Sequence, residues 1–137
     1  MTPEILARIT AARAARDLSD LARQTVAATA EPASPAERIQ QARLLRKMAA
    51  DVVDLVVLAE RLAGASWEEI TQALRRRDEA TVREEYDESV AEWAALPEDR
   101  MEAAAAGAEA LDAWYSRHRE DHDPESSSPV TDLLNRH

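Results

Sequence analysis

Arginine and carboxylate side chains crowd a short stretch near the middle of the chain, where the sequence offers the most chemistry. Three consecutive arginines, Arg75–Arg77, come directly before a segment that is rich in acids. Guanidinium groups bind phosphates, and a carboxylate or hydroxyl can read base edges in duplex DNA. One hypothesis is therefore a DNA-binding surface. Its residues are Arg75, Arg76, Arg77 and Arg83 at phosphates, with Glu79 and Thr81 nearest the bases. The alternative is that the arginines only end a helix and solvate a turn.

A second group of candidate residues is acidic. Glu84, Glu85 and Glu88 are followed by Glu109 and Asp112 in an EExxE…ExxD pattern. Carboxylates on facing helices can hold Mg²⁺ and bridge it to phosphates. The pattern is similar to the carboxylate cluster of all-α nucleoside-triphosphate pyrophosphohydrolases of the MazG kind, which implies Mg²⁺-dependent nucleotide hydrolysis as a further alternative. A chain this rich in glutamate also produces such a pattern by chance.

The charge of the chain is unevenly distributed. The formal net charge is −10, but residues 1–86 carry 13 Arg or Lys against 14 Asp or Glu, whereas residues 87–137 carry 4 against 13. The arginine stretch therefore lies in a nearly neutral part of the chain. Cysteine is absent, which excludes disulfides, thiolate metal sites and cysteine nucleophiles. We expect no cofactor and no metal site, because His118 and His122 fall in a segment that is expected to be exposed.

The length and the hydropathy pattern favour one domain outside membranes. A chain of 137 residues fits a single domain. No apolar run approaches the roughly 20 residues that a spanning helix needs, and the first residues lack the pattern of a signal peptide. We therefore expect a cytoplasmic protein without a membrane partner.

The elements that must position the arginines are helices with clear start signals. Thr2 and Pro3 begin a first helix, which we interpret as a docked arm, and the segment Glu31–Pro35 interrupts it. Ser34 caps a second helix from about Pro35 to Ala63, whose segment Val52–Ala59 is apolar almost all round. We expect neighbours on several sides of that segment and take this helix as the central one of the bundle.

The third and fourth helices frame the arginines. Gly64 ends the second helix, Ser66 and Glu69 form a capping box, and Asp78 caps a fourth helix that reaches Leu96. The side chains that must be buried to set the angle between the two short helices are Trp67, Ile70, Leu74 and Val82. A fifth helix is expected over about Glu98–His118.

These elements predict an all-α fold, a helical bundle of about five helices with a long central helix and a helix-turn-helix unit at about residues 53–93. Residues 1–118 form a single helical domain in this interpretation. Residues 119–137 form a mostly flexible acidic tail, in which Val130–Asn135 could dock as one short helical turn.

The central motif also carries a resemblance. The segment Ala63–Ile70 reads AGASWEEI, Ala73 and Leu74 follow it, and Glu79–Arg83 reads EATVR. Over residues 36–90 the chain resembles small bacterial helix-turn-helix proteins with a GASWEEIG-type motif. Arg75 stands where the turn of that family has glycine. The resemblance implies a mostly helical DNA-binding-type fold that serves transcription regulation.

We accordingly expect a non-enzymatic regulatory protein of the helix-turn-helix type that binds DNA. The alternative is a helix-turn-helix-like scaffold used for protein-protein interaction or homodimerisation without DNA binding. The partners expected from the sequence are therefore DNA, a second copy of the chain, or another protein.

Overall fold

The computed structural model describes residues 1–135, and within that range the chain contains helices and no strand. The expected all-α fold is therefore confirmed. Arg136 and His137, the last residues of the expected tail, lie outside the described residues. No helix in the described range has the length and hydropathy needed to cross a membrane.

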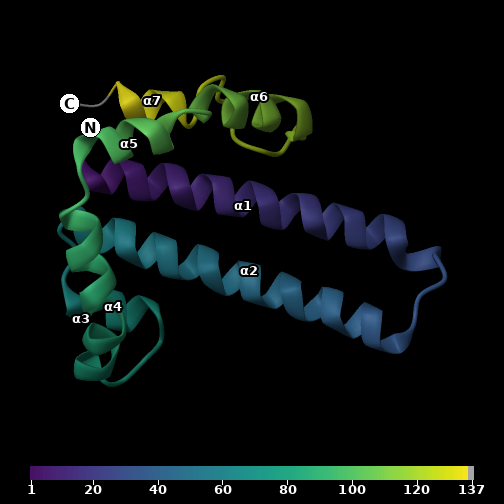
Figure 1. Ribbon diagram of the computed structural model, residues 1–137, viewed down its shortest axis with the longest axis horizontal. Coiled ribbons are helices and arrows are strands. Elements are labelled where there is room, and N and C mark those ends of the chain that lie inside the picture. The colour runs from purple at the N-terminus through teal and green to yellow at the C-terminus, as the bar shows by residue number, and fades with distance from the viewer. Residues whose placement is uncertain (136–137) are drawn as a thin grey trace.

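A long antiparallel helical hairpin forms the body of the molecule (Figure 1). It consists of α1 (Pro3–Ala27), a short 3₁₀ turn η1 (Ala28–Ala30) and α2 (Pro35–Leu62). Both helices begin where the capping residues predict. The Thr2 hydroxyl accepts a hydrogen bond from the backbone N–H of Ile5, and the Ser34 hydroxyl accepts one from that of Glu37.

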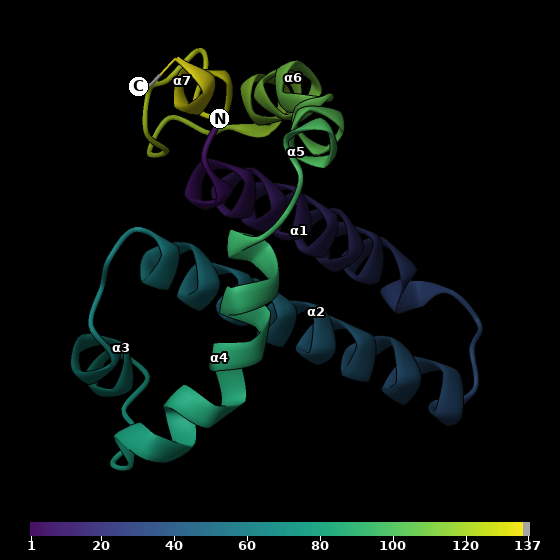
Figure 2. The same cartoon turned by 60° about the vertical axis from the view of Figure 1, so that its left-hand side comes forward.

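The remaining helices pack at one end of the hairpin and on two sides of it. α3 (Trp67–Ala73) and α4 (Glu79–Ala94) pack beside the carboxyl-terminal end of α2. α5 (Glu98–Ala105), α6 (Ala108–His118) and α7 (Thr131–Leu134) pack on α1 instead (Figures 1 and 2). α1 therefore lies between α2 and the carboxyl-terminal helices.

The single fifth helix expected over residues 98–118 is wrong, because the structure breaks it into α5 and α6. The break lies at Ala106 and Gly107, and Gly107 has a left-handed φ of 99°. Arg13 of α1 donates hydrogen bonds to the carbonyl oxygens of Ala104, at 2.9 Å, and Ala106, at 3.3 Å. These carbonyls therefore have a partner outside the helix, which compensates for the interrupted helical hydrogen bonds.

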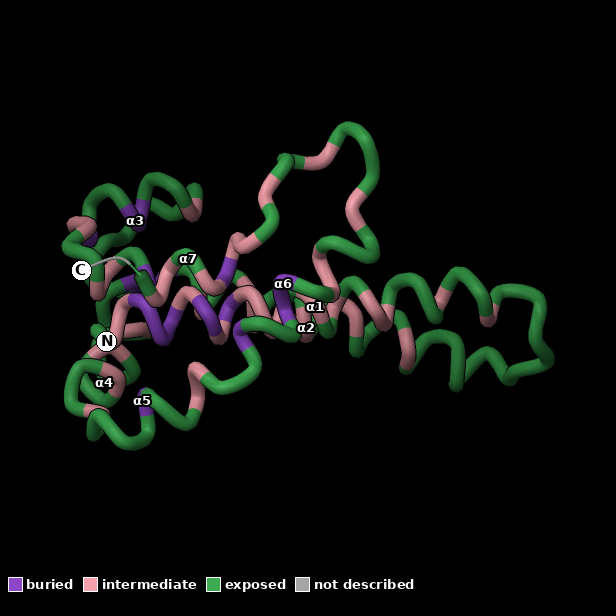
Figure 3. Tube along the Cα trace, turned by 90° about the horizontal axis from the view of Figure 1, so that it is seen from above, coloured by how far each residue is buried: buried purple, intermediate pink, exposed green. Residues whose placement is uncertain are grey.

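The core is concentrated at the end of the hairpin where the other helices pack (Figure 3). The amino-terminal half of α1 is the most thoroughly buried segment, with Ala7 and Ile9 fully inaccessible. The neighbours expected on several sides of Val52–Ala59 are present, since α1, α3 and α4 all pack on α2, but the side chains of Val53 and Val56 remain 47% and 45% exposed. The packing of α5, α6 and α7 on α1, rather than on α2, is the reason.

The segment after α6 returns to the body and ends in α7, the helical turn expected near Val130. The side chain of Val130 is buried in a cluster with Ile5, Ile9 and Leu111. The carboxylate of Asp112 accepts hydrogen bonds from the backbone N–H of Val130, at 2.7 Å, and from the N–H and the hydroxyl of Thr131. The start of α7 is thus fixed to α6 by one buried carboxylate.

Candidate functional site at the turn between α3 and α4

The end of α2 and the two helices that follow it share one apolar cluster. Its buried members are Val57, Trp67, Ile70 and Val82, and Leu74 packs against them. The predicted burial is therefore confirmed for Trp67, Ile70 and Val82, whereas Leu74 is only partly buried. Since the cluster includes residues of α2, α3 and α4, it fixes the relative orientation of these three helices.

An arginine adds to the packing of the anchor tryptophan. The guanidinium carbon of Arg61 lies 4.8 Å from the ring centre of Trp67, which is a cation–π arrangement. The same guanidinium donates a hydrogen bond of 2.8 Å to the carbonyl oxygen of Ala65. Arg61 thereby connects the end of α2 to the start of α3.

The turn after α3 has the hydrogen-bond pattern of a Schellman motif. Arg75 adopts a left-handed conformation with φ of 56° and donates its backbone N–H to the carbonyl of Gln72. The N–H of Arg76 reaches back to the carbonyl of Thr71 at 3.0 Å. Such a turn usually carries glycine at its left-handed position, and the resemblance noted above has glycine at this place. The turn leaves the side chains of all three arginines, Arg75–Arg77, exposed.

Asp78 begins α4 and organises its first turn. Its carboxylate accepts hydrogen bonds from the backbone N–H groups of Ala80 and Thr81 and from the Thr81 hydroxyl. The hydroxyl hydrogen bond from Thr81, followed by the backbone one, holds the pKa of Asp78 below its usual value. Asp78 is therefore a charged cap at neutral pH.

The structure brings the predicted DNA-binding residues together on this turn and the first turns of α4, but they are not equally available. Arg75, Arg77 and Arg83 are exposed and form no ion pair within residues 1–135. Arg76 is also exposed, but its guanidinium lies 3.3 Å from the carboxylate of Glu85. Glu79 is exposed at the start of α4, while the exposed Thr81 already donates its hydroxyl to Asp78.

The exposed surface of α4 is strongly acidic. Its exposed charged residues include one base, Arg83, and six acids. The acids are Glu79, Glu84, Glu85, Asp87, Glu88 and Glu92. A helix with this charge is repelled by the closely spaced phosphates of duplex DNA along most of its length. The basic part of the site is therefore confined to the turn and the beginning of α4.

A hydrogen bond between α4 and α2 holds the site in place, and the sequence did not reveal it. The Tyr86 hydroxyl donates to the carboxylate of Asp54 at 2.8 Å. Burial of the ring and this hydrogen bond raise the pKa of Tyr86 to about 12. The two residues lie 32 positions apart, so local spacing offers no signal for the pair.

The carboxylates of the EExxE…ExxD pattern do not meet. α4 packs on α2 and α3, whereas α6 packs on α1 and α7. Asp112, the last acid of the pattern, instead holds the start of α7. Within residues 1–135 no three or more His, Cys, Asp or Glu side chains are grouped so as to hold a metal ion. His118, at the end of α6, is stacked on Trp114.

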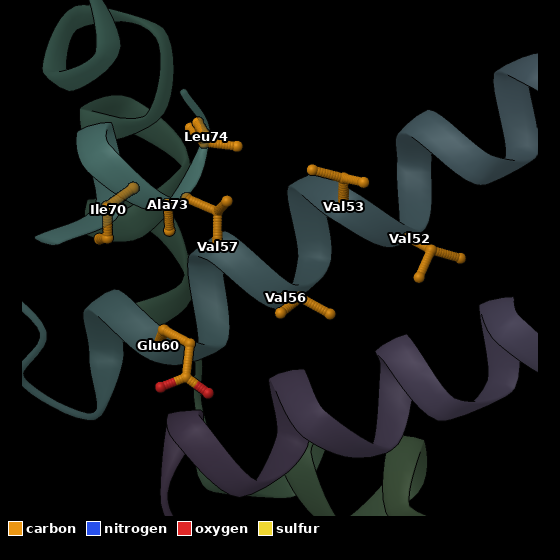
Figure 4. A pocket seen from close by; sticks show the side chains of 8 residues that line it. All are labelled: Val52, Val53, Val56, Val57, Glu60, Ile70, Ala73 and Leu74. Carbon is orange, nitrogen blue, oxygen red and sulfur yellow. The ribbon is translucent and has the colours of Figure 1, made fainter. Parts of the chain in front are cut away.

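Sequence reasoning also missed an apolar groove beside the turn (Figure 4). It encloses about 290 Å³ between α2 and α3. Its lining residues are Val52, Val53, Val56, Val57 and Glu60 of α2, Ile70 and Ala73 of α3, and Leu74 directly after α3. The signal that could have revealed it is the heptad-like spacing of Ala49, Val53 and Val56 along α2.

No family model matches the chain, and neither the curated proteins nor the solved structures contain a significant match.

Proposed function

We propose that the chain is a non-enzymatic regulatory protein of the helix-turn-helix type, which contacts duplex DNA through the α3–α4 turn. The observation that carries this proposal is the left-handed turn at Arg75, directly before the Asp78 cap of α4. It displays Arg75 and Arg77 beside the first turns of a helix whose orientation is fixed by a common core. Transcription regulation in the cytoplasm is the role that fits such a unit.

The arginines that form no ion pair within the described residues are the ones we expect to bind phosphates. Arg75, Arg77 and Arg83 can bind phosphates without first breaking a contact, whereas Arg76 would have to leave Glu85. Base contacts are limited to the start of α4, where Glu79 can accept from a cytosine amino group. The Thr81 hydroxyl keeps acceptor capacity while it donates to Asp78. The remaining acids of α4 must stay clear of the backbone of the duplex.

A salt-dependent DNA titration tests this function. We expect fluorescence anisotropy to detect binding of a labelled duplex at low salt, with a logarithmic salt slope of about −3 for three phosphate contacts. Arg77→Gln should weaken binding to every duplex and reduce the slope by about 1. Arg117→Gln, which removes the same charge from an exposed position on α6, is the matched control and should change neither quantity. No binding to any duplex at low salt would overturn the proposal.

The acidic surface of α4 favours a second candidate, a scaffold that binds a basic protein partner without DNA. An arginine-rich peptide is the probe for this function. Salt-sensitive binding of the peptide that is lost in the double variant Glu84→Lys, Asp87→Lys, together with no DNA binding, would favour the scaffold. DNA binding that survives at moderate salt, with no peptide binding, would favour the DNA-contacting function instead.

A further inference from the structure

The neighbours of α2 leave one stripe of its surface largely exposed. Its residues recur at alternating spacings of three and four, the spacing of the a and d positions of a heptad repeat. We call this set the outer seam: Ile39, Ala42, Arg46, Ala49, Val53, Val56 and Glu60. Every member of the outer seam is exposed. A helix therefore presents a coiled-coil pattern to solvent, in addition to the side that packs on α1.

The apolar centre of the outer seam coincides with the groove between α2 and α3. Val53 and Val56 remain about half exposed there, and Ala73 at the end of α3 and Leu74 after it extend the apolar surface beside them (Figure 4). Ala49, one turn before Val53, is small enough to let a second helix approach closely. Two neighbouring, half-exposed valines flanked by alanine offer the knobs and the space that helix-on-helix packing needs.

The charges along α2 identify what can lie on this surface. Residues 35–50 contain four bases and one acid, whereas residues 51–62 contain three acids and one base. On the outer seam itself, Arg46 precedes the valines and Glu60 follows them. A helix of the same sequence in the antiparallel direction, paired at the valines, would bring its Glu60 close to Arg46 of the first helix. In the parallel direction, arginine would face arginine and glutamate would face glutamate.

We propose that the part of the outer seam from Arg46 to Glu60 is a homodimer interface and that its occupant is the antiparallel α2 of a second copy of the chain. A twofold axis between Val53 and Val56 places each Val53 opposite Val56 of the other copy. Ala49 then lies opposite Glu60, and Arg46 lies one turn away from that same Glu60, within reach of its long side chain. The aliphatic part of Arg46 can also cover the valines while its charge reaches the carboxylate.

Only part of α2 can pair in this register. Residues 47–62 overlap with the same residues of the second copy, which is about four helical turns. The partner helix also contacts the apolar surface of α3 that lines the groove. We expect a dimer that dissociates on dilution rather than an obligate one. Dimer formation through this surface goes beyond the proposed DNA contact and is independent of it, since none of the arginines of the α3–α4 turn takes part.

Sedimentation equilibrium of the full chain over a wide concentration range measures the dimer directly. Val53→Glu and Val56→Glu should each raise the dimer dissociation constant at least ~30-fold, because a carboxylate would be buried at the centre of the interface. Leu44→Glu is the matched control: Leu44 has the same exposure as Val53, 47%, but lies nine residues away, on the opposite side of the helix. Its dissociation constant should equal that of the parent chain. Circular dichroism verifies that each variant is folded, and Val53→Ser replaces Val53→Glu if that variant is not.

A charge swap tests the antiparallel register. Arg46→Glu and Glu60→Arg should each weaken the dimer, and the double variant should restore it. Glu60 also lies 3.6 Å from Arg8 within one chain, so recovery in the double variant separates the interface from that internal ion pair. A monomer at all accessible concentrations would overturn the proposal. A dimer that ignores both valine variants, one that is equally sensitive to Leu44→Glu, or a double variant without recovery would overturn it too.

Discussion

Arg75 holds a backbone conformation that is costly for a residue with a side chain. Its φ of 56° is the only positive φ at a non-glycine residue within residues 1–135. The left-handed backbone conformation costs a residue with a Cβ roughly 1–2 kcal/mol. Glycine avoids this cost but loses more conformational entropy on folding, which offsets part of the difference. The turn therefore keeps a guanidinium at a position where glycine would be more stable. This is the expected pattern when a strained residue serves a function.

Replacing Arg75 by glycine should stabilise the fold. For Arg75→Gly we expect a gain of up to about 1 kcal/mol in the free energy of unfolding, which corresponds to a rise in Tm of about 3–5 °C. Arg77→Gly removes the same charge where φ is not positive, and it should be neutral or destabilising. Thermal unfolding followed by circular dichroism measures both. Equal shifts in the two variants would mean that charge, not backbone conformation, is responsible.

Asp78 makes the stability of the site depend on pH. Its pKa is lowered in the folded state, chiefly by the Thr81 hydroxyl, so its charged form stabilises the fold. That contribution is complete above the unfolded-state pKa of about 3.9 and disappears as the pH falls through the lower folded-state pKa. The stability lost in Asp78→Ala, measured by urea unfolding, should be constant near neutral pH and shrink below about pH 4.

Asparagine at this position separates capping from ionisation. Asp78→Asn retains an acceptor for the α4 amides and should recover most of the stability at neutral pH, but it cannot titrate. A deficit in Asp78→Ala that persists undiminished in strong acid would contradict the proposed role of the charge.

The features of the helices that could be predicted from the sequence are those set by residues close together in the chain, chiefly the helix starts. The starts of α1, α2, α3 and α4 are confirmed because each depends on a side chain that caps amides two or three residues away. The break between α5 and α6 was missed because its carbonyls are satisfied by Arg13, which is 91 and 93 residues away from them. The hydrogen bond between Tyr86 and Asp54 was missed for the same reason.

The attachment of α7 depends on one carboxylate. Asp112 is buried and accepts hydrogen bonds from two backbone amides and a hydroxyl at the start of α7. Asp112→Ala should lower the free energy of unfolding by about 1.5–3 kcal/mol, since hydrogen bonds to a charged acceptor are lost and buried amides are left unpaired. Thr131→Val removes only the hydroxyl and should cost about 1 kcal/mol.

Limited proteolysis reports where that stability is lost. We expect Asp112→Ala to accelerate cleavage in residues 119–129, because release of α7 frees one end of this segment. Unchanged cleavage in that variant would show that the apolar contacts of Val130 alone hold α7 on the body.

For the whole molecule, the hydropathy pattern predicts that α2 is the most buried helix, but the structure shows that α1 is. The segment Val52–Ala59 is more apolar than any part of α1, yet the start of α1 is buried more completely. Small residues such as Ala7 and Ala11 let α1 approach helices on two sides, which composition alone does not reveal. The position of the core follows from which helices cross, and those crossings join residues far apart in the sequence.

The hairpin therefore has a stable end and a weakly stabilised end. All residues from Glu31 to Gln40 are exposed, whereas Ile5–Ala7 and Val57–Ala59 are buried at the opposite end. Amide protection depends on buried contacts around each helix turn, so the two ends of the same helices should open with different free energies. In native-state hydrogen exchange, amides near the connection between α1 and α2, up to about residue 45 in α2, should exchange through local opening. Their exchange rates should not change when a low concentration of denaturant is added. Amides of residues 57–62 should exchange only through global unfolding, with a steep denaturant dependence. Uniform protection along all of α2 would contradict this gradient, because it would require the hairpin to open as one cooperative unit.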